Sequence, residues 1–134
     1  MANSDYNKMI LEGRFVKTPD LHYTKNTNMA IAHGTLATNK VYTMKNGEEK
    51  TETMFTDVEI FGKQAEFAGQ KFTKGLRVIA EGHLRQDVWE SQDGRKNSKH
   101  IFVIERFAFI DFAKLNNNNR QNNNNSYGND EPMY

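Results

Sequence analysis

Residues 54–89 read MFTDVEIFGKQAEFAGQKFTKGLRVIAEGHLRQDVW, and this stretch decides the fold. Its two ends, Met54–Phe61 and Leu76–Trp89, alternate apolar and polar side chains, which is typical of strands buried on one side. Between them, small and aromatic residues recur at helical spacing, which predicts a short helix over Lys63–Phe72. The stretch therefore predicts a strand, a helix and a second strand.

Further strands are predicted on both sides of this stretch. An Asn-Gly pair at residues 46–47 indicates a tight hairpin that leads into the third strand, which begins near Lys50. Gly13 lies inside the first strand and suggests a bulge or bend there. The remaining predicted segments are strand Lys8–Val16, short strand Leu21–Thr24, strand Met29–Thr43, loop Ser91–Ser98 and strand Lys99–Phe112.

Five main strands with one short helix between the third and the fourth are the order of the OB-fold, an all-β five-stranded barrel. An SH3-like barrel lacks this helix, and a β-sandwich usually has more strands. We therefore predict an OB-fold domain over residues 1–113. Residues 114–134 are rich in asparagine and offer almost no apolar surface, so we predict that they form a disordered tail.

Large aromatic side chains lie on the predicted solvent face of the two strands. The predicted core faces comprise Met54, Thr56, Val58 and Ile60 in one strand, and Leu76, Val78, Ala80, Gly82 and Leu84 in the other. Phe55, Phe61 and Trp89 fall on the opposite faces, beside Asp57 and Glu59 in the first strand. Such rings mark either a subunit contact or a surface that stacks against something flat.

The sequence offers no catalytic or metal-binding motif. It contains no cysteine, which excludes disulfides, thiol nucleophiles and cysteine-rich metal sites. The four histidines, His22, His33, His83 and His100, lack metal-ligand spacing, and no serine elbow or phosphate loop occurs. We therefore expect a protein that is not an enzyme and carries neither metal nor cofactor.

Charge and hydropathy narrow the classes of protein to which the chain can belong. The net charge is +1, so charge alone does not indicate nucleic acid, although a local basic stripe is compatible with it. The N-terminus lacks an apolar signal core, and no apolar run is long enough to span a membrane. We expect a cytoplasmic protein with no membrane partner.

Several motifs resemble, in order, those of bacterial-type single-stranded DNA-binding proteins (SSB). They are Asn7–Phe15, Thr18–Tyr23, Thr35–Thr38, Phe61–Glu66, Lys74-Gly75, Glu81–Arg85 and Trp89–Gly94. The resemblance extends over roughly residues 6–111. It implies an OB-fold, assembled as a homotetramer and associated with the nucleoid, that binds single-stranded DNA during replication, recombination and repair.

The resemblance also implies which residues contact DNA. The base-stacking rings fall on Tyr42, Phe55, Phe61 and Trp89, and the basic contacts on Lys8, Lys63, Lys74 and Arg85. Tyr42 and Phe55 replace residues that are often tryptophan in the family. Asp57 lies where some relatives are basic, so the phosphate contacts are not expected to match one for one.

The last five residues, Asp130, Glu131, Pro132, Met133 and Tyr134, resemble the acidic tip through which the family recruits replication and repair proteins. The tip has only two acids, and a tail that serves solubility alone remains the alternative. For the domain itself, the alternative is an OB-fold module that uses its rings to contact another protein.

Overall fold

A computed structural model of the chain describes residues 3–110, so the predicted tail and its tip lie outside the described residues. These residues form six strands and one helix. In chain order they are β1 (Met9–Phe15), β2 (Asp20–Tyr23), β3 (Ala30–Thr43), β4 (Glu49–Phe61), α1 (Lys63–Lys71), β5 (Arg77–Glu90) and β6 (Lys96–Phe109). Within this range no helix is both long and apolar enough to cross a membrane.

All six strands belong to one sheet with the order β1-β5-β6-β4-β3-β2. The sheet closes because the end of β1 also pairs with β3, joining Arg14 to Ala37 and Phe15 to Leu36. Gly13, where the sequence predicts a bulge or bend, lies beside this junction, and a Cβ there would meet the Ala37 carbonyl oxygen at 2.8 Å. The predicted five-stranded OB barrel is confirmed, and the short predicted segment becomes β2, which pairs with β3 outside the barrel.

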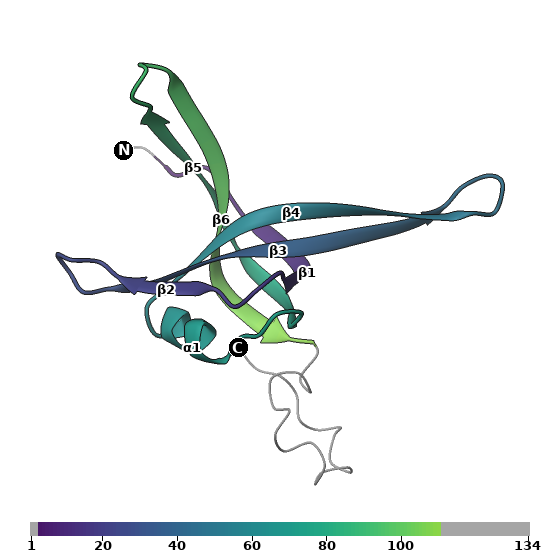
Figure 1. Ribbon diagram of the computed structural model, residues 1–134, viewed down its shortest axis with the longest axis horizontal. Coiled ribbons are helices and arrows are strands. Elements are labelled where there is room, and N and C mark those ends of the chain that lie inside the picture. Colours follow the sequence, from purple (N-terminus) through teal and green to yellow (C-terminus); the bar gives the residue numbers. More distant parts are fainter. Residues whose placement is uncertain (1–2, 111–134) are drawn as a thin grey trace, which may run out of the picture.

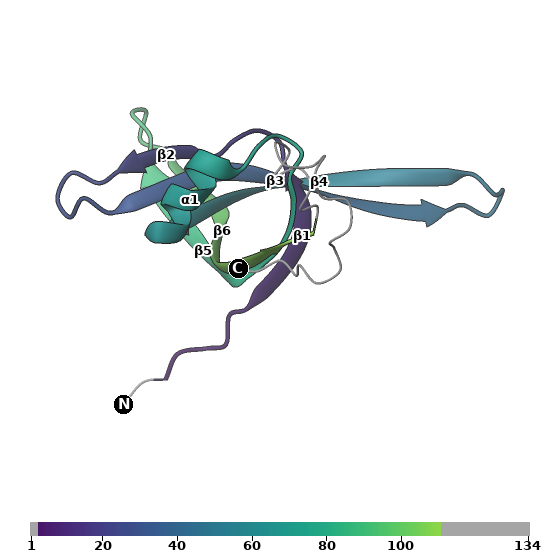
Figure 2. The same cartoon turned by 90° about the horizontal axis from the view of Figure 1, so that it is seen from below.

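Three arms extend from the barrel, namely the β3–β4 hairpin, the β5–β6 hairpin and the turn between β2 and β3 (Figures 1 and 2). The predicted Asn-Gly turn joins β3 to β4, with Gly47 at φ 92°. The β5–β6 loop covers only residues 91–95, because β6 begins at Lys96 and not at Lys99 as predicted. Each long arm is therefore a two-stranded ribbon almost to its tip.

The core fills the barrel and the space beneath α1, which covers one end of it (Figure 2). Phe72, directly after the helix, packs its ring 5.0 Å from that of Phe15 and 5.3 Å from that of Phe107. Ala65 and Ala68 of α1 are fully buried, as their helical spacing predicts. The largest fully buried side chains are Phe15, Phe72, Phe102, Leu36, Ile60, Leu76, Val58 and Val78.

A bulge in β6 adjusts which side chains enter this core. Glu105 is an extra residue opposite the step before Gly82, and a Cβ on Gly82 would lie only 1.8 Å from the carbonyl oxygen of Val103. Glycine is therefore required where the two backbones approach. Because the bulge shifts the alternation by one residue, Phe102 before it and Phe107 after it are both buried.

The predicted faces need three corrections. The alternation predicts that Met54 and Leu84 lie in the core, yet 49% and 37% of their surfaces are exposed. Both lie toward the arms, where a two-stranded ribbon has no second layer to cover its inner face. The alternation predicts that Glu59 faces solvent, but only 7% of it is exposed, because Arg85 and His33 pair with its carboxylate.

Candidate nucleic-acid interface

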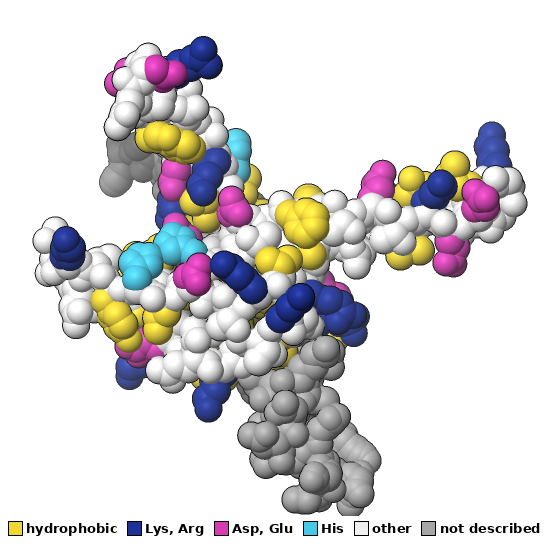
Figure 3. Space-filling model, in the orientation of Figure 1, with side chains coloured by type: hydrophobic (Ala, Val, Ile, Leu, Met, Phe, Trp, Pro, Cys, Tyr) yellow, Lys and Arg dark blue, Asp and Glu magenta, His cyan; other side chains and the backbone are white. Residues whose placement is uncertain are grey.

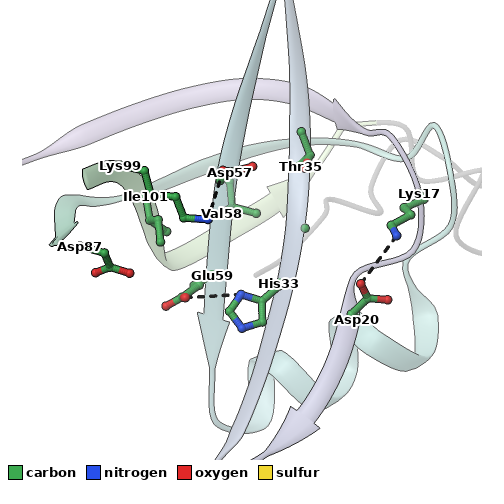
Figure 4. Close-up of a pocket in the computed structure, with 11 residues that line it drawn as sticks. Lys17, Asp20, His33, Thr35, Asp57, Val58, Glu59, Asp87, Lys99 and Ile101 are labelled. Carbon is green, nitrogen blue, oxygen red and sulfur yellow. Dashed lines mark ion pairs between the residues drawn. The ribbon is translucent and has the colours of Figure 1, made fainter. Parts of the chain in front are cut away.

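An open groove runs over the outer face of the barrel, between the β2–β3 arm and the β5–β6 arm (Figures 3 and 4). We call it the central groove. Its volume is about 380 Å³. The residues that line it are Lys17, Asp20, His33, Gly34, Thr35, Asp57, Val58, Glu59, Asp87, Lys99 and Ile101. Its floor is the polar face of β4, which continues into β6 and β5 through the sheet pairing.

Three of the predicted rings lie around this groove on the outer face. Phe55 and Phe61 lie on the same side of β4 as Asp57, and 65% of Phe55 is exposed while Phe61 is partly buried. Trp89 lies near the end of β5, on the same side of that strand as Asp87, and is 47% exposed. The prediction that the rings face solvent is confirmed for Phe55 and Trp89 within this single chain, whereas Phe61 is partly buried.

The fourth predicted ring, Tyr42, lies on a different face. In the β3–β4 ribbon Tyr42 is opposite Lys50, whereas Phe55 is opposite Ala37. Because paired residues share a face and faces alternate along a strand, Tyr42 and Phe55 lie on opposite faces of this arm. Tyr42 therefore does not share the outer face with Phe55 and Phe61. A ligand that contacts all four must pass around the edge of the arm.

Arg85, one of the predicted phosphate contacts, is engaged by carboxylates. Its guanidinium lies 2.8 Å from Asp87 Oδ1 and 2.9 Å from Glu59 Oε1. The hydrogen bonds that Arg85 donates to Asp87 first, and then to Glu59, raise the pKa of Arg85 above its ordinary value. The same contact, with a weaker contribution from Lys99, holds the pKa of Asp87 below its ordinary value. These contacts occupy Nε and Nη2 of Arg85, so a phosphate that approaches the guanidinium competes with two carboxylates.

The three predicted lysines differ in whether a carboxylate is paired with them. Lys8 forms an ion pair with Glu81, which also contacts Arg106, and the hydrogen bond to Glu81 raises the pKa of Lys8. Lys63 at the start of α1 and Lys74 before β5 are exposed, and neither forms an ion pair with any residue in 3–110. Of the three, Lys63 and Lys74 can bind a phosphate without losing an ion-pair partner.

The structure shows ion pairs on this face that the sequence does not predict. Lys99 lies 3.7 Å from Asp57, and His33 Nδ1 lies 3.4 Å from Glu59 Oε2 (Figure 4). The ring of His33 also stacks on that of His22. Only the alternation that placed Asp57 and Glu59 on one face hinted at this network. Residues 3–110 contain no cluster of three or more acids and histidines that could hold a metal ion.

Comparison with known sequences identifies relatives of this chain. The model of the Single-strand binding protein family matches residues 6–110. A single-stranded DNA-binding protein of Wolinella succinogenes is 32% identical over 129 residues, which cover 96% of this chain and 79% of that protein. Those of Helicobacter pylori and Aquifex aeolicus are 35% and 36% identical, over 79% and 81% of this chain. The matched part is 59% of the Helicobacter protein and 72% of the Aquifex protein.

Solved structures show the same architecture. A Plasmodium falciparum SSB in complex with ssDNA superimposes with a TM-score of 0.73 at 23% identity, over 83% of this chain and all of that one. A deletion mutant of the single-stranded DNA binding protein from Thermus aquaticus gives a TM-score of 0.67 at 30% identity. That match covers 78% of this chain and 50% of the Thermus chain. At 23% identity, the similarity to the Plasmodium structure establishes the fold alone.

Proposed function

The chain belongs to the single-strand binding protein family, and on this premise we propose that it binds single-stranded DNA without strong sequence preference. It protects the strand during replication, recombination and repair, in the cytoplasm and at the nucleoid, and it performs no catalysis. The observation that carries this proposal is the position of Phe55 and Trp89, two large exposed rings on the outer face beside the central groove.

Stacking supplies the attraction that does not depend on sequence. Every base has a flat π-face, so each ring that a base covers contributes about 1–3 kcal/mol whatever the base. Phe55, Phe61 and Trp89 serve as stacking residues on the outer face. We propose that Tyr42 stacks a base on the other face of the β3–β4 arm, so that the strand wraps this arm.

Neutralisation of phosphates by basic side chains supplies the rest of the attraction for DNA. Lys63 and Lys74 bind phosphates directly, whereas at Lys8 and Arg85 a phosphate competes with the carboxylates that these side chains already contact. Each neutralised phosphate contributes about −0.7 to the slope of log affinity against log salt for single strands. We therefore expect a slope near −1.4 per subunit if only Lys63 and Lys74 act, and near −2.8 if all four act.

We further propose that the protein is a homotetramer, with the domain over residues 1–113. A second apolar surface supports association, because Ile10 and Ile79 are 61% and 40% exposed and line one hollow with Ala108. The tail over residues 114–134 carries the tip of Asp130, Glu131, Pro132, Met133 and Tyr134, which recruits replication and repair proteins.

A fluorescence titration tests the proposed function. Trp89 is the only tryptophan, so its emission reports on one site in each subunit. Oligo-dT should quench this emission, and native mass spectrometry should show tetramers that carry the oligonucleotide. If oligo-dT binds by filter retention but leaves the emission unchanged, Trp89 does not stack a base. If no oligonucleotide binds at low salt, the function itself is wrong.

A further inference from the structure

We infer that His22 and His33 form an additional contact for single-stranded DNA, whose strength depends on imidazole protonation. The inference rests on the proposed function and assigns to it a site at the β2–β3 end of the central groove. The two rings are parallel to within 7°, with centroids 4.9 Å apart. Both side chains are exposed, and Figure 3 shows histidines gathered beside acidic side chains over this region.

The register places this pair in line with a predicted stacking ring. His22 is opposite Ile31 across the β2–β3 ladder, and Ile31 is opposite Phe61 across the β3–β4 ladder. Since directly paired residues point to the same side of a sheet, His22, Ile31 and Phe61 form one transverse row on the outer face. Single-stranded DNA that stacks on Phe61 and continues along this row reaches the imidazole pair. Histidine is among the side chains on which bases stack.

The charge around the pair makes its protonation decisive. The charged groups that line the groove together with His33 are Lys17 before β2, Asp20 on β2, Asp57 and Glu59 on β4, Asp87 on β5 and Lys99 on β6, and Arg85 of β5 contacts Glu59. The groups that line the groove are four carboxylates and two cations, and with Arg85, which is paired to Glu59, the total charge is −1 while both imidazoles are neutral. One imidazolium brings the charge to zero, and two make it positive.

Phosphate therefore meets repulsion at high pH and attraction at low pH. The Glu59 carboxylate, 3.4 Å from His33 Nδ1, provides a counter-charge for an imidazolium at that position. A phosphate beside His22 provides a second one. Because imidazoles change charge between about pH 5 and pH 8, the affinity for DNA should rise as the pH falls through this range.

Two substitutions of His22 separate its ring from its charge. His22→Phe keeps a flat ring that cannot be protonated, and His22→Gln removes both the ring and the charge. His100→Gln is the matched control, because His100 pairs with Gln86 on the face of the β5–β6 arm opposite to Trp89. Affinity of the full chain for oligo-dT is measured against salt at about pH 8 and about pH 5.5, on either side of the imidazole range.

For the parent protein, the salt slope should be steeper at the lower pH by about 0.7 for each imidazolium that meets a phosphate. His22→Phe should match the parent at high pH and lose about 0.7 of this steepening. His22→Gln should bind about fivefold or more weakly at both pH values, because a stacking ring is lost. His100→Gln should behave like the parent.

A parent slope that is the same at both pH values would overturn the inference while leaving the proposed function intact. Equal effects of His100→Gln and His22→Phe would also overturn it, because the pH dependence would then not arise at the stacked pair. Absence of binding at both pH values would instead contradict the proposed function.

Discussion

At the scale of single residues, the exposed and the buried phenylalanines should respond in opposite ways to truncation. Phe55 is 65% exposed and Phe102 is fully buried. Phe55→Ala should weaken binding of oligo-dT by about 1–3 kcal/mol, since one stacked base is lost. It should change the free energy of unfolding by no more than about 0.5 kcal/mol, as surface substitutions do.

Phe102→Ala serves as the comparison, because it leaves a cavity and should cost about 3–5 kcal/mol of stability. Urea unfolding measures the stability of both variants, and titration with oligo-dT measures the affinity of Phe55→Ala. A loss of stability in Phe55→Ala as large as that in Phe102→Ala would show that Phe55 belongs to the folded core.

The alternation of side chains predicts faces but not burial. It correctly placed Phe55 and Trp89 on the outer side of their strands, because the period of a strand is a property of its backbone. It placed Glu59 in solvent and Met54 in the core, and both were wrong. Burial depends on what covers a face, and here Arg85 and His33, brought from other strands, enclose Glu59.

At the scale of elements, an arginine of β5 forms an ion pair within its own strand, and this pair competes with a bound phosphate. Arg85 and Asp87 are two residues apart on one side of the strand, 2.8 Å from nitrogen to oxygen. Asp87→Asn should weaken this ion pair without changing the shape of the side chain at position 87. We expect tighter binding of oligo-dT and a salt slope steeper by about 0.7, because Arg85 becomes available to one more phosphate.

The control for Asp87→Asn removes the same charge from another surface. Glu12→Gln on β1 releases Arg77, whose guanidinium lies 3.7 Å from the Glu12 carboxylate, outside the central groove. Both variants raise the net charge of the protein equally. If Glu12→Gln steepens the salt slope as much as Asp87→Asn does, the effect comes from total charge and not from the release of Arg85.

The β5–β6 bulge should be intolerant of any side chain at Gly82. The Cβ of Gly82→Ala would lie 1.8 Å from the Val103 carbonyl oxygen, so the two strands must separate or shift their register. We expect a loss of about 3 kcal/mol or more in the free energy of unfolding, at the upper end of overpacking costs. Thermal or urea unfolding measures this loss.

Gly94→Asn provides the contrast for Gly82→Ala. Gly94 has φ 85° and no atom within 4 Å of its Cβ position, and asparagine tolerates this conformation better than most residues. Its stability should therefore remain close to that of the parent. Equal losses in the two variants would indicate that the turn, and not the bulge, limits the stability of this arm.

The order of elements was predictable, whereas the length of the arms was not. Turn chemistry at Asn46-Gly47 and helical spacing after Phe61 are local signals, so the sequence is sufficient for them. Residues 96–98 are polar and resemble a loop, yet they form ladder pairs with β5. In a ribbon exposed on both faces the strand has no apolar alternation, so its extent cannot be predicted from the pattern.

At the scale of the whole molecule, the candidate site combines parts that no single segment contains. The net charge is only +1, so attraction for DNA must come from local features. The family resemblance predicts the rings, but the opposite facing of Tyr42 and Phe55 follows from their register across the β3–β4 hairpin. The pairing of Arg85 with Glu59 joins β5 to β4, and neither strand alone predicts it.

The domain should supply the thermal stability and the affinity for DNA without the tail. A chain that ends at residue 113 should keep the thermal midpoint and the affinity for oligo-dT of the full protein. The reason is that residues 114–134 hold almost no apolar surface to bury, and their charges, Lys114 and Arg120 against Asp130 and Glu131, cancel. Removing them therefore changes neither the core nor the net charge that DNA meets.

Differential scanning calorimetry and a salt series of oligo-dT titrations, on the truncated and the full chain side by side, measure both quantities. A shallower salt slope in the truncated chain would mean that Lys114 or Arg120 neutralises a phosphate. A tighter affinity at low salt would mean that Asp130 and Glu131 compete with DNA for the same cations. Lys63 and Lys74, which are exposed and free of ion pairs within residues 3–110, are predicted DNA contacts for which the tail acids would then compete.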